Sequence, residues 1–334
     1  MSSILTNASA MTALQTLSAT NKNLATTQSR ISTGMKVAEA QDNAAYWSIA
    51  TTMRSDNKAN DVISSSLGLG GAKIDTAYTA VKDTISVVDQ IKEKVLSAKN
   101  ASADDRAKIQ TEISALQKQL GESVKASYAG SNLLSTDSSK DATQGDFSIV
   151  SSYNRNSDGT VSTGSIDVAL KDIRLVDTGP ATDAAGDPVP RQGILDKGIA
   201  ITAKDASDGT DVTTSFNILT LNVADATIDV GGTDTDITID NDAIDQMLAG
   251  LEKAAGGLAT AAATLGAANN RVSLQTTLVK SLSDAIDRGI GAMVDADMNA
   301  ESARLSALQV QQQLGVQALS IANQSTQNIL SLFR

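Results

Sequence analysis

The sequence contains no cysteine and no histidine among its 334 residues. Without these side chains, the chain can form no disulfide, no zinc site built from cysteine or histidine, and no catalytic triad that depends on histidine. Nothing else in the sequence resembles an active site. We therefore expect a protein that is not an enzyme and that needs no metal or other cofactor.

Aromatic residues make up only 2 % of the chain, which favours helices packed through Ala, Leu, Ile and Val over a core built around aromatic rings. No apolar run is long enough to span a membrane, and no basic segment precedes an apolar one at the N-terminus. We therefore expect neither a membrane protein nor a substrate of the ordinary signal-peptide route. The net charge of −11 argues against a nucleic-acid partner.

Charged residues are missing from both ends of the chain. Leu305–Phe333 contains no Asp, Glu, Lys or Arg, and Ser2–Asn21 contains none either. On a helix of 3.6 residues per turn, the large apolar residues between 305 and 321 fall into two nearly opposite stripes. The first stripe is Leu305, Leu308, Val316 and Leu319, and the second is Val310, Leu314 and Ile321. A helix with two apolar stripes needs two partners.

The free energies of burial and of backbone ordering indicate whether this tail can be ordered without such partners. Fully burying the large apolar side chains of Leu305–Phe333 gains roughly 16–33 kcal/mol, whereas ordering its backbone costs roughly 30–60 kcal/mol. One interpretation is a buried helix of a single globular domain. The second charge-free end favours another, an assembly core made jointly by both termini. Its predicted residues are Ile4, Leu5, Met11, Leu14, Leu17, Leu305, Leu308, Val310, Leu314, Val316, Leu319, Ile321, Ile329, Leu330, Leu332 and Phe333.

Two long stretches repeat apolar residues at steps of four and three, which is the pattern of a coiled-coil seam. The first runs from Ile63 to Ala98 and the second from Met247 to Ile286, with Leu282 among its members. Because the periods match, the two helices should lie side by side, and the second should span roughly 65 Å.

Shorter patterns predict the elements around these helices. A helix whose apolar positions run from Ile109 to Val124 should be N-capped by Ser102 and should end near Gly130. A weaker heptad from Met11 through Leu14, Leu17, Asn21, Leu24 and Gln28 to Ile31 should end where Ser32-Thr33-Gly34 loosens the helix. Residues 35–47 should form a connector, in which we expect a packing role for Trp47, the only tryptophan.

Residues 141–240 differ in character from the rest of the chain. They contain all three prolines, and short β-rich segments alternate with turns. The predicted strands are Phe147–Tyr153, Ser165–Val176, Gly198–Thr202, Phe216–Val223, Thr227–Val230 and Thr235–Ile239. We expect an inserted β-rich surface domain that a short Gly/Ser link could replace with assembly retained. Its run of aspartates is more typical of a solvated strand face than of a calcium site.

The predicted fold is therefore mainly α, a long antiparallel coiled-coil helical bundle formed by both chain ends, with an inserted β-rich outer domain. We expect three parts. Residues 1–40 and 295–334 form an inner terminal-helix domain, residues 41–140 and 241–294 form the coiled-coil bundle, and residues 141–240 form the insert.

Several blocks of residues at both ends resemble bacterial flagellins closely. They are Arg30–Val37, Asp42–Ala45, Ile49–Ala50, Tyr128–Leu134, Leu265–Ala267, Asn270–Arg271, Asp295–Asp297, Ala322–Gln324 and Gln327–Arg334. The resemblance covers about residues 1–140 and 241–334 and looks closest to alphaproteobacterial flagellins. The middle of the chain carries no family signal.

The resemblance implies a structural subunit that polymerises into the bacterial flagellar filament for swimming motility. The terminal helices would form an inner tube, the heptad helices an outer tube, and the insert the surface. The implied location is extracellular, after secretion through the flagellar export channel without a signal peptide. A hook–filament junction protein shares the helical ends and is the alternative, but the flagellin-like ending at Arg334 favours the filament subunit.

The resemblance also implies partners. These are further copies of the chain, with or without other flagellins, the flagellar export apparatus, an export chaperone, and the filament cap and hook-junction proteins. No nucleic acid and no membrane is expected among them. A flagellin that carries an enzyme in its insert usually needs a zinc motif with two histidines, which this chain lacks.

Two segments depart from the family pattern where immune receptors of plants and vertebrates sense flagellins. In residues 28–50, Gln41 replaces Lys, Asn43 replaces Asp, and Tyr46-Trp47 replaces Gly-Leu. In residues 89–94, Gln90 replaces the first Arg and Lys94 replaces the Leu of the usual Gln-Arg-Val-Arg-Glu-Leu. The first segment loses two charges and gains two bulky rings, and in the second a glutamine cannot reproduce the paired hydrogen bonds of an arginine fork. We therefore expect weak or absent activation of both receptors.

Overall fold

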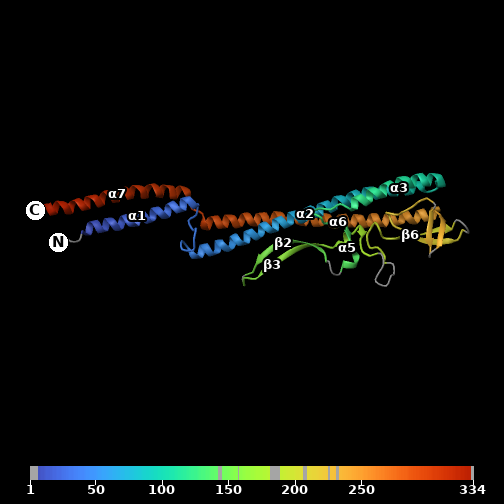
Figure 1. Ribbon diagram of the computed structural model, residues 1–334, viewed down its shortest axis with the longest axis horizontal. Coiled ribbons are helices and arrows are strands. Elements are labelled where there is room, and N and C mark those ends of the chain that lie inside the picture. The colour runs from blue at the N-terminus through green and yellow to red at the C-terminus, as the bar shows by residue number, and fades with distance from the viewer. Residues whose placement is uncertain are drawn as a thin grey trace. The chain divides into compact units, whose positions relative to one another are not determined.

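The computed structural model describes residues 7–141, 145–156, 158–180, 189–205, 209–224, 226–230 and 233–331. The chain is mainly helical (Figure 1), which confirms the predicted fold class. The helices are α1 (Ala8–Thr33), α2 (Ala44–Ala98), α3 (Ala103–Val124), α5 (Leu170–Ile173), α6 (Asn241–Val294) and α7 (Met298–Ser331). The chain divides into two compact units, residues 1–59 with 281–334 and residues 60–280. The three-part organisation expected from the sequence stays a prediction.

In the unit of residues 60–280, α2 and α6 pack side by side in opposite directions. Ion pairs join Lys92 to Glu252 and Lys99 to Asp245. Every position of the predicted α2 seam is buried, and so are the predicted α6 positions from Met247 to Val272. Strict spacing of large apolar residues was therefore enough to identify this interface.

The predicted α6 seam is wrong at Leu282, which is 45 % exposed. The positions that turn inward after Val279 are Ser283, Ile286 and Ile290, so the steps are four, three and four. A step of four from Val279, in place of three, rotates Leu282 away from the seam.

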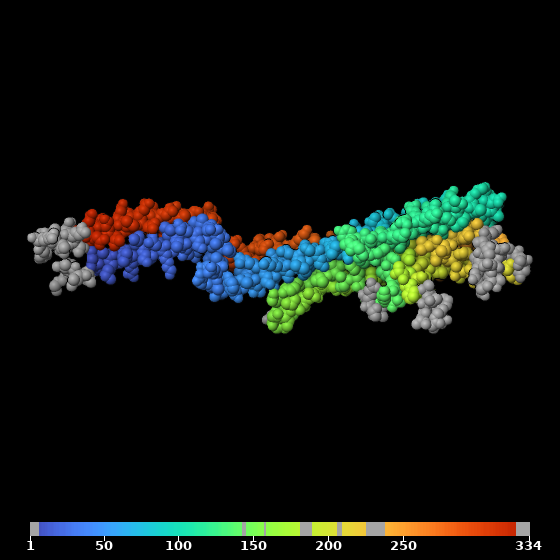
Figure 2. Space-filling model, viewed as in Figure 1, coloured from blue at the N-terminus to red at the C-terminus, as the bar shows by residue number. Residues whose placement is uncertain are grey.

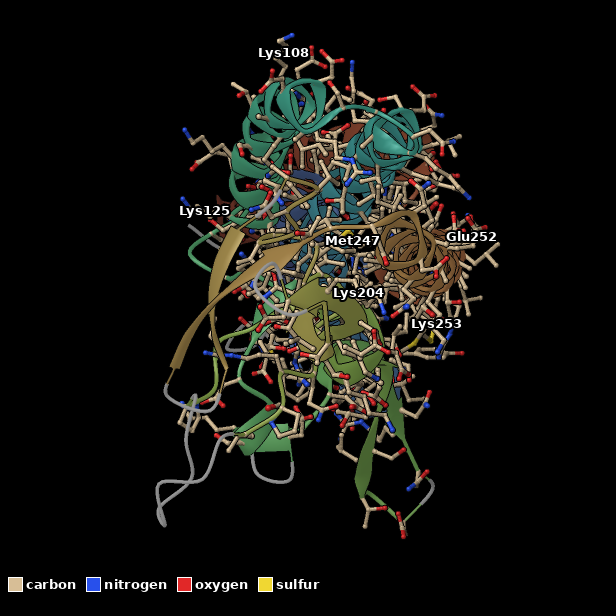
Figure 3. All side chains as sticks on the ribbon, turned by 90° about the vertical axis from the view of Figure 1, so that its right-hand side faces the viewer. Lys108, Lys125, Lys204, Met247, Glu252 and Lys253 are labelled. Atoms are coloured by element: carbon tan, nitrogen blue, oxygen red, sulfur yellow. The ribbon has the colours of Figure 1, made fainter. Side chains whose placement is uncertain are left out.

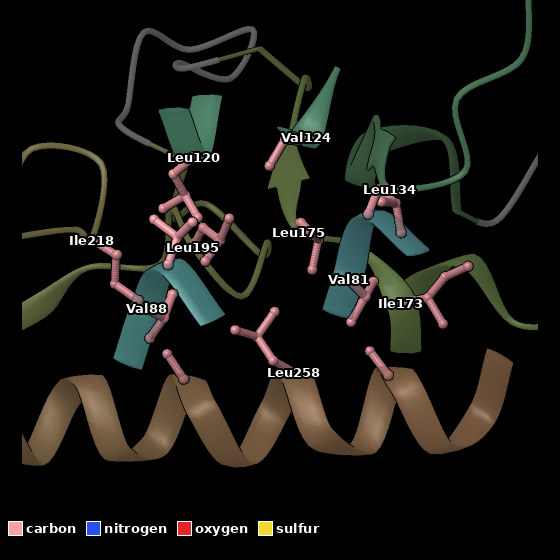
Figure 4. Packing of buried hydrophobic residues seen from close by; sticks show 14 of the residues in the cluster. Val81, Val88, Leu120, Val124, Leu134, Ile173, Leu175, Leu195, Ile218 and Leu258 are labelled. Atoms are coloured by element: carbon pink, nitrogen blue, oxygen red, sulfur yellow. The ribbon is translucent and has the colours of Figure 1, made fainter. Parts of the chain in front are cut away.

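Charged side chains of the helices in this unit lie on its outside, whereas Arg174, Asp177 and Asp196 of the insert are buried. Lys108, Lys125 and Lys253 point outward, whereas Met247 lies toward the interior (Figure 3). The close view of the core shows Val81 and Val88 of α2 facing Leu258 of α6, with buried residues from α3 and from residues 134–218 around them (Figure 4).

Helix α3 begins as predicted and ends earlier than predicted. The Ser102 hydroxyl accepts a hydrogen bond from the Asp105 N–H at 3.3 Å, which caps the first turn. The helix ends at Val124, where the Asn132 side-chain amide donates to the carbonyl of Val124 at 2.8 Å. Gly130 (φ 73°) lies instead in a separate turn closed by backbone hydrogen bonds between Tyr128 and Ser131.

The insert contains short strands in three sheets. The strands are β1 (Ser135–Thr136), β2 (Phe147–Arg155), β3 (Val161–Val168), β4 (Val176–Asp177), β5 (Ile199–Asp205), β6 (Asp211–Phe216), β7 (Ala226–Val230) and β8 (Thr233–Thr238), and a 3₁₀ turn spans Ser138–Lys140. β1 pairs with β4 in parallel and β2 with β3 antiparallel, while β6, β5, β8 and β7 form an antiparallel sheet in that order.

Two of the predicted strands are wrong in extent or in kind. Residues 165–176 are divided between β3, the short helix α5 and β4. Residues 217–223 form no strand, because the Asn217 side chain closes a turn with Thr220 at 2.9 Å and the Val223 N–H donates to Gln110 of α3 at 2.9 Å. Hydrogen bonds to α3 thus take the place of those that a strand would make with a neighbouring strand.

Two isoleucine side chains of the insert pack against glycines of α2 and α6. A Cβ atom added at Gly70 of α2 would lie 2.5 Å from the Ile149 side chain, and one added at Gly250 of α6 would lie 2.5 Å from Ile199. The buried residues of the insert that share one core with α2 and α6 include Ile149, Ile166, Val168, Ile173, Leu175, Leu195, Ile201, Ile218, Leu221 and Val223. A Gly/Ser link in place of the insert would uncover this core, so the expectation that assembly survives the replacement loses its physical basis.

A pair of alanine substitutions in α2 tests this packing. Gly68 has no atom within 4 Å of an added Cβ, so Gly68→Ala should stabilise the unit by up to about 1 kcal/mol through helix propensity. Gly70→Ala should instead destabilise it by roughly 1–3 kcal/mol, because the methyl group collides with Ile149. Thermal melting followed by circular dichroism measures both changes. Equal stabilisation by the two variants would mean that Ile149 does not pack on α2.

A second test concerns the pH dependence of the same unit. The buried Asp177 carboxylate accepts N–H bonds from Ser138, Gly179 and Gln192 at 2.9–3.1 Å. Burial by itself would raise its pKa, but a hydrogen bond from the Ser138 side chain and these three backbone hydrogen bonds lower the pKa to about 2. Because the pKa is lower in the folded state, the carboxylate contributes about 2–3 kcal/mol that is present above pH 4 and lost as the pH falls toward 2. The free energy of unfolding, measured with urea, should differ less between pH 6 and pH 2.5 for Asp177→Asn than for the unchanged chain.

Candidate functional site: the outward faces of the terminal helix pair

Helices α1 and α7 lie side by side in opposite directions (Figure 1). The Asn7 side chain caps α1 by accepting from the Ala10 N–H at 3.1 Å, and Gly34 (φ 73°) ends that helix, as the sequence predicted. The Asp297 carboxylate caps α7 by accepting from the Asn299 N–H at 2.9 Å. The backbone N–H groups of Lys36 and Val37 donate to the carbonyl of Val294, and that of Ala296 donates to the carbonyl of Gly34, so the start of α7 is held beside the end of α1.

The seam between the two helices is built mostly from small and polar residues. Its buried and half-buried positions are Ala10, Ala13, Leu17, Thr20, Leu24, Thr27 and Ile31 on α1, and Glu301, Leu305, Leu308, Gln312, Gly315, Leu319 and Ala322 on α7. These positions follow steps of three and four. The heptad predicted for α1 shares Leu17, Leu24 and Ile31 with this seam. It is wrong at Asn21 and Gln28, which are exposed. Met11 and Leu14, which it included, point away from α7.

The outward faces of both helices carry large apolar side chains. Met11 and Leu14 of α1 are 64 % and 58 % exposed, and Val310, Leu314, Val316 and Ile321 of α7 are 53–67 % exposed. On the face shown in Figure 2, both helices lie open along their length. Between Leu305 and Ser331, α7 carries no charge that would suit these faces to water.

The two stripes predicted for α7 differ in one residue from what the structure shows. Leu305, Leu308 and Leu319 face α1, and Val310, Leu314 and Ile321 point away from it. Val316 was assigned to the first stripe and is 53 % exposed, because its neighbour Gly315 takes the seam position. Ile4, Leu5, Leu332 and Phe333 lie outside the described residues, as do the side chains of Ile329 and Leu330 in α7.

The residues that hold the pair together were not predicted from the sequence. Gln312 donates to the side chain of Asn21 at 2.8 Å, and Arg30 pairs with Glu301 at 3.2 Å. A Cβ atom at Gly315 would lie 3.2 Å from the end of the Leu17 side chain, so this glycine permits close approach. The sequence signal for this seam was the recurrence of Ala, Thr and Gly at steps of three and four. A search for hydrophobic residues alone does not detect it.

The positions at which the sequence predicts altered receptor recognition lie on the surface. Gln41 is exposed, and the Asn43 side chain caps α2 by accepting from the Tyr46 N–H at 3.2 Å. Tyr46 is 47 % exposed, and Trp47 is 36 % exposed in the first turn of α2, so the packing role expected for Trp47 is not seen.

In the second recognition segment, Gln90 is exposed on α2. Lys94 forms an ion pair with Glu112 of α3 at 2.5 Å and is 43 % exposed. Both side chains are therefore at the surface, where a receptor would meet them.

No metal or membrane site was found in the part of the chain that the structure describes. In it, no three carboxylate, histidine or cysteine side chains gather as they would around a metal ion. None of the helices searched has the length and hydropathy to cross a bilayer. Asp225 of the acidic run lies outside the described residues, as do the side chains of Asp229, Asp234 and Asp236.

Comparison with known proteins gives the same assignment at both ends of the chain. Residues 4–139 match the bacterial flagellin N-terminal helical region, and residues 248–333 match the bacterial flagellin C-terminal helical region. Over the full length of both chains, this chain is 46 % identical to a flagellin of Brucella melitensis biotype 1. It is 44 % identical to Flagellin C of Rhizobium meliloti strain 1021, again over the full length of both.

Among solved structures, the flagellar junction protein FlgL from Legionella pneumophila is similar at 16 % identity and a TM-score of 0.36, over 75 % of this chain and 98 % of that one. A likeness this distant carries no argument, whereas the two full-length relatives are flagellins. The hook–filament junction alternative is therefore not favoured, and the resemblance to alphaproteobacterial flagellins is confirmed. The chain belongs to the bacterial flagellin family and is a structural subunit of the flagellar filament.

Proposed function

We propose that this chain assembles into the filament by burying the outward faces of α1 and α7 against neighbouring copies. The observation that carries the proposal is the set of large apolar side chains, each more than half exposed, on two helices with almost no charge. Burying what remains exposed of these six side chains would gain roughly 5–11 kcal/mol per subunit. Their own seam offers the helices few large side chains, so neighbouring copies supply the packing that they lack.

The proposed polymerisation core has two layers. Met11, Leu14, Val310, Leu314, Val316 and Ile321 contact other copies, and Leu17, Leu305, Leu308 and Leu319 hold the two helices of one subunit together. We include Ile4, Leu5, Ile329, Leu330, Leu332 and Phe333 in the core from the charge-free composition of both ends.

The rest of the proposal follows from family membership. The terminal helices form the inner tube, the coiled-coil helices the outer tube, and residues 141–240 the surface. The subunit reaches its place through the flagellar export channel, with no signal peptide and with an export chaperone. It assembles beneath the filament cap and onto the hook-junction proteins, and it has a structural role without catalysis.

Electron microscopy of filaments assembled from the purified chain tests the proposal. A helical reconstruction is expected to place α1 and α7 nearest the filament axis, with Leu314 and Ile321 in contact with neighbouring copies. A filament in which these two side chains face solvent would contradict the proposed core.

A separate prediction concerns the immune receptors. Losing an arginine anchor costs about 2 kcal/mol or more, which is about thirtyfold in affinity. We therefore expect the purified monomer to activate the vertebrate receptor weakly. We expect a peptide of residues 28–50 to activate the plant receptor weakly as well, because that segment loses two charges and gains two bulky rings. The combined variant Gln90→Arg with Lys94→Leu is the matched control and should recover most of the vertebrate response. Half-maximal doses equal to those of a typical flagellin, before any substitution, would show that these positions do not matter.

A further inference from the structure

The seam between α1 and α7 contains one ion pair with unusual surroundings. Arg30 Nη1 lies 3.2 Å from Glu301 Oε1, and Glu301 is only 9 % exposed. Arg30 Nε and Glu301 Oε2 are also buried, and neither has a hydrogen-bond partner among the described residues. The Arg30 side chain is 31 % exposed, so it is the Glu301 carboxylate that depends on its partner, because a buried charge that loses its partner is strongly unfavourable.

The apolar residues of this seam do not by themselves select one alignment of the helices. In the observed alignment, Leu17 lies over Gly315. A shift of α7 by one heptad, about 10 Å along the helix, would place Leu24 over Gly315 in one direction and Leu17 over Leu308 in the other. In both shifts, most seam positions would meet small or apolar residues again, as heptad spacing requires. The hydrogen bond between Asn21 and Gln312 would be lost, and the second shift would place Leu24 over Glu301.

The ion pair distinguishes these alignments, as do the backbone hydrogen bonds from Lys36 and Val37 to Val294 and from Ala296 to Gly34, which hold the two helix ends together. A shift of one heptad in either direction moves Arg30 away from Glu301 by about 10 Å and separates the two charges. The same shift would displace Met11 and Leu14 by that distance relative to Leu314 and the other outward residues of α7. The two outward faces would then no longer present one surface.

We propose that Arg30 and Glu301 are positioning residues that, together with these backbone hydrogen bonds, select the register of the α1–α7 pair and so align the two outward faces for assembly. The second half of this statement rests on the proposed function, whereas the first half concerns a single subunit. The two can be measured separately.

Because the chain contains no cysteine, an introduced cysteine pair reports the register directly. A Cβ atom at Gly315 would lie 3.9 Å from the Leu17 Cβ, which is within the range of about 3.5–4.5 Å that disulfides adopt. Leu17→Cys with Gly315→Cys therefore reports the observed register. Leu24→Cys with Gly315→Cys and Leu17→Cys with Leu308→Cys report the two shifted registers.

Each reporter pair is oxidised in the otherwise unchanged chain and in charge variants, both assembled and below the assembly concentration. In the unchanged chain, the observed-register pair should form an intramolecular disulfide and the shifted pairs should not. Arg30→Glu or Glu301→Arg alone should raise the ratio of shifted to observed cross-links by about tenfold or more, and filament yield should fall. The double exchange, Arg30→Glu with Glu301→Arg, should restore both. Lys22→Glu, an exposed charge reversal on α1, is the matched control and should change neither.

An unchanged cross-link ratio in Arg30→Glu, or a double exchange that leaves the ratio disturbed, would overturn the inference. Failure of the observed-register pair to form in the unchanged chain would refute the alignment itself. Loss of assembly with the register preserved would count against the proposed function and leave the register assignment standing. The melting curve of residues 60–280 should be the same in all variants, which excludes general misfolding.

Discussion

Leu314→Lys is expected to abolish filament formation and to leave the monomer folded. In the monomer, Leu314 is 58 % exposed on α7, so a lysine there can extend its ammonium group into water at little cost. In the proposed filament, the same position is packed between copies. An unpaired charge among apolar neighbours costs several kcal/mol. Because every 1.4 kcal/mol changes the assembly equilibrium tenfold, a cost of about 3 kcal/mol raises the concentration needed for assembly about a hundredfold.

Leu96→Lys provides a closely matched control. Leu96 lies on α2 and is also 58 % exposed, so the two variants carry the same new charge at equally accessible leucines. Circular dichroism should show the same helix content in both. Sedimentation after seeding with short filaments should leave only Leu314→Lys in the supernatant. A wild-type yield from Leu314→Lys, or an equal loss from both variants, would refute a specific role for the outward face of α7.

The coiled coil of α2 and α6 could be predicted from the sequence because large apolar residues carry its register. Between Ile63 and Ala98, the seam is buried at every predicted position. A large apolar side chain recurs at least once in every heptad of both helices, and these side chains lose so much exposed area on pairing that few other arrangements compete. The prediction was wrong at Leu282, where apolar spacing continues and the helix turns its polar neighbour Ser283 inward.

The seam between α1 and α7 could not be predicted in the same way. On α1, both Met11 and Ala10 follow helical spacing, and the larger side chain suggested that Met11 lies in the seam. The structure places Ala10 there and turns Met11 outward. Small residues permit the close approach of two helices, whereas hydrophobicity rewards large ones. The side of a helix that meets its own partner, rather than a neighbouring subunit, is thus decided by contacts that are distant in sequence.

The insert shows the same limit for strands. Phe216–Val223 has the composition of a strand, but Gln110 and Gln117 of α3 form hydrogen bonds with its backbone, among them one from Gln117 to the carbonyl of Leu221 at 2.9 Å. Likewise, nothing near Gly70 in the sequence indicates that Ile149 will lie on it. Strand propensity reports a local preference, and tertiary contacts override it where they supply other partners for the backbone.

Removing residues 305–334 is expected to leave a soluble, partly helical monomer that forms no filaments. The deletion removes nearly all of the α7 seam, including Leu308 and Gly315, and with it the outward residues of α7. Leu17 and Leu24 of α1 then lose their partner, and an isolated helix with few large side chains is marginally stable in water.

The coiled-coil unit should not change, because its buried cluster lies entirely within residues 63–279. Circular dichroism should therefore show a melting transition at the same temperature as in the full-length monomer, with less helix at the start. Brief trypsin treatment should cleave after Lys22 and Arg30 of α1 faster in the truncated chain than in the full-length monomer, and equally slowly at Lys92 in both. Filaments of normal length from the truncated chain would show that α7 is dispensable for assembly, and a lower melting temperature would show that the coiled coil depends on the tail for its stability.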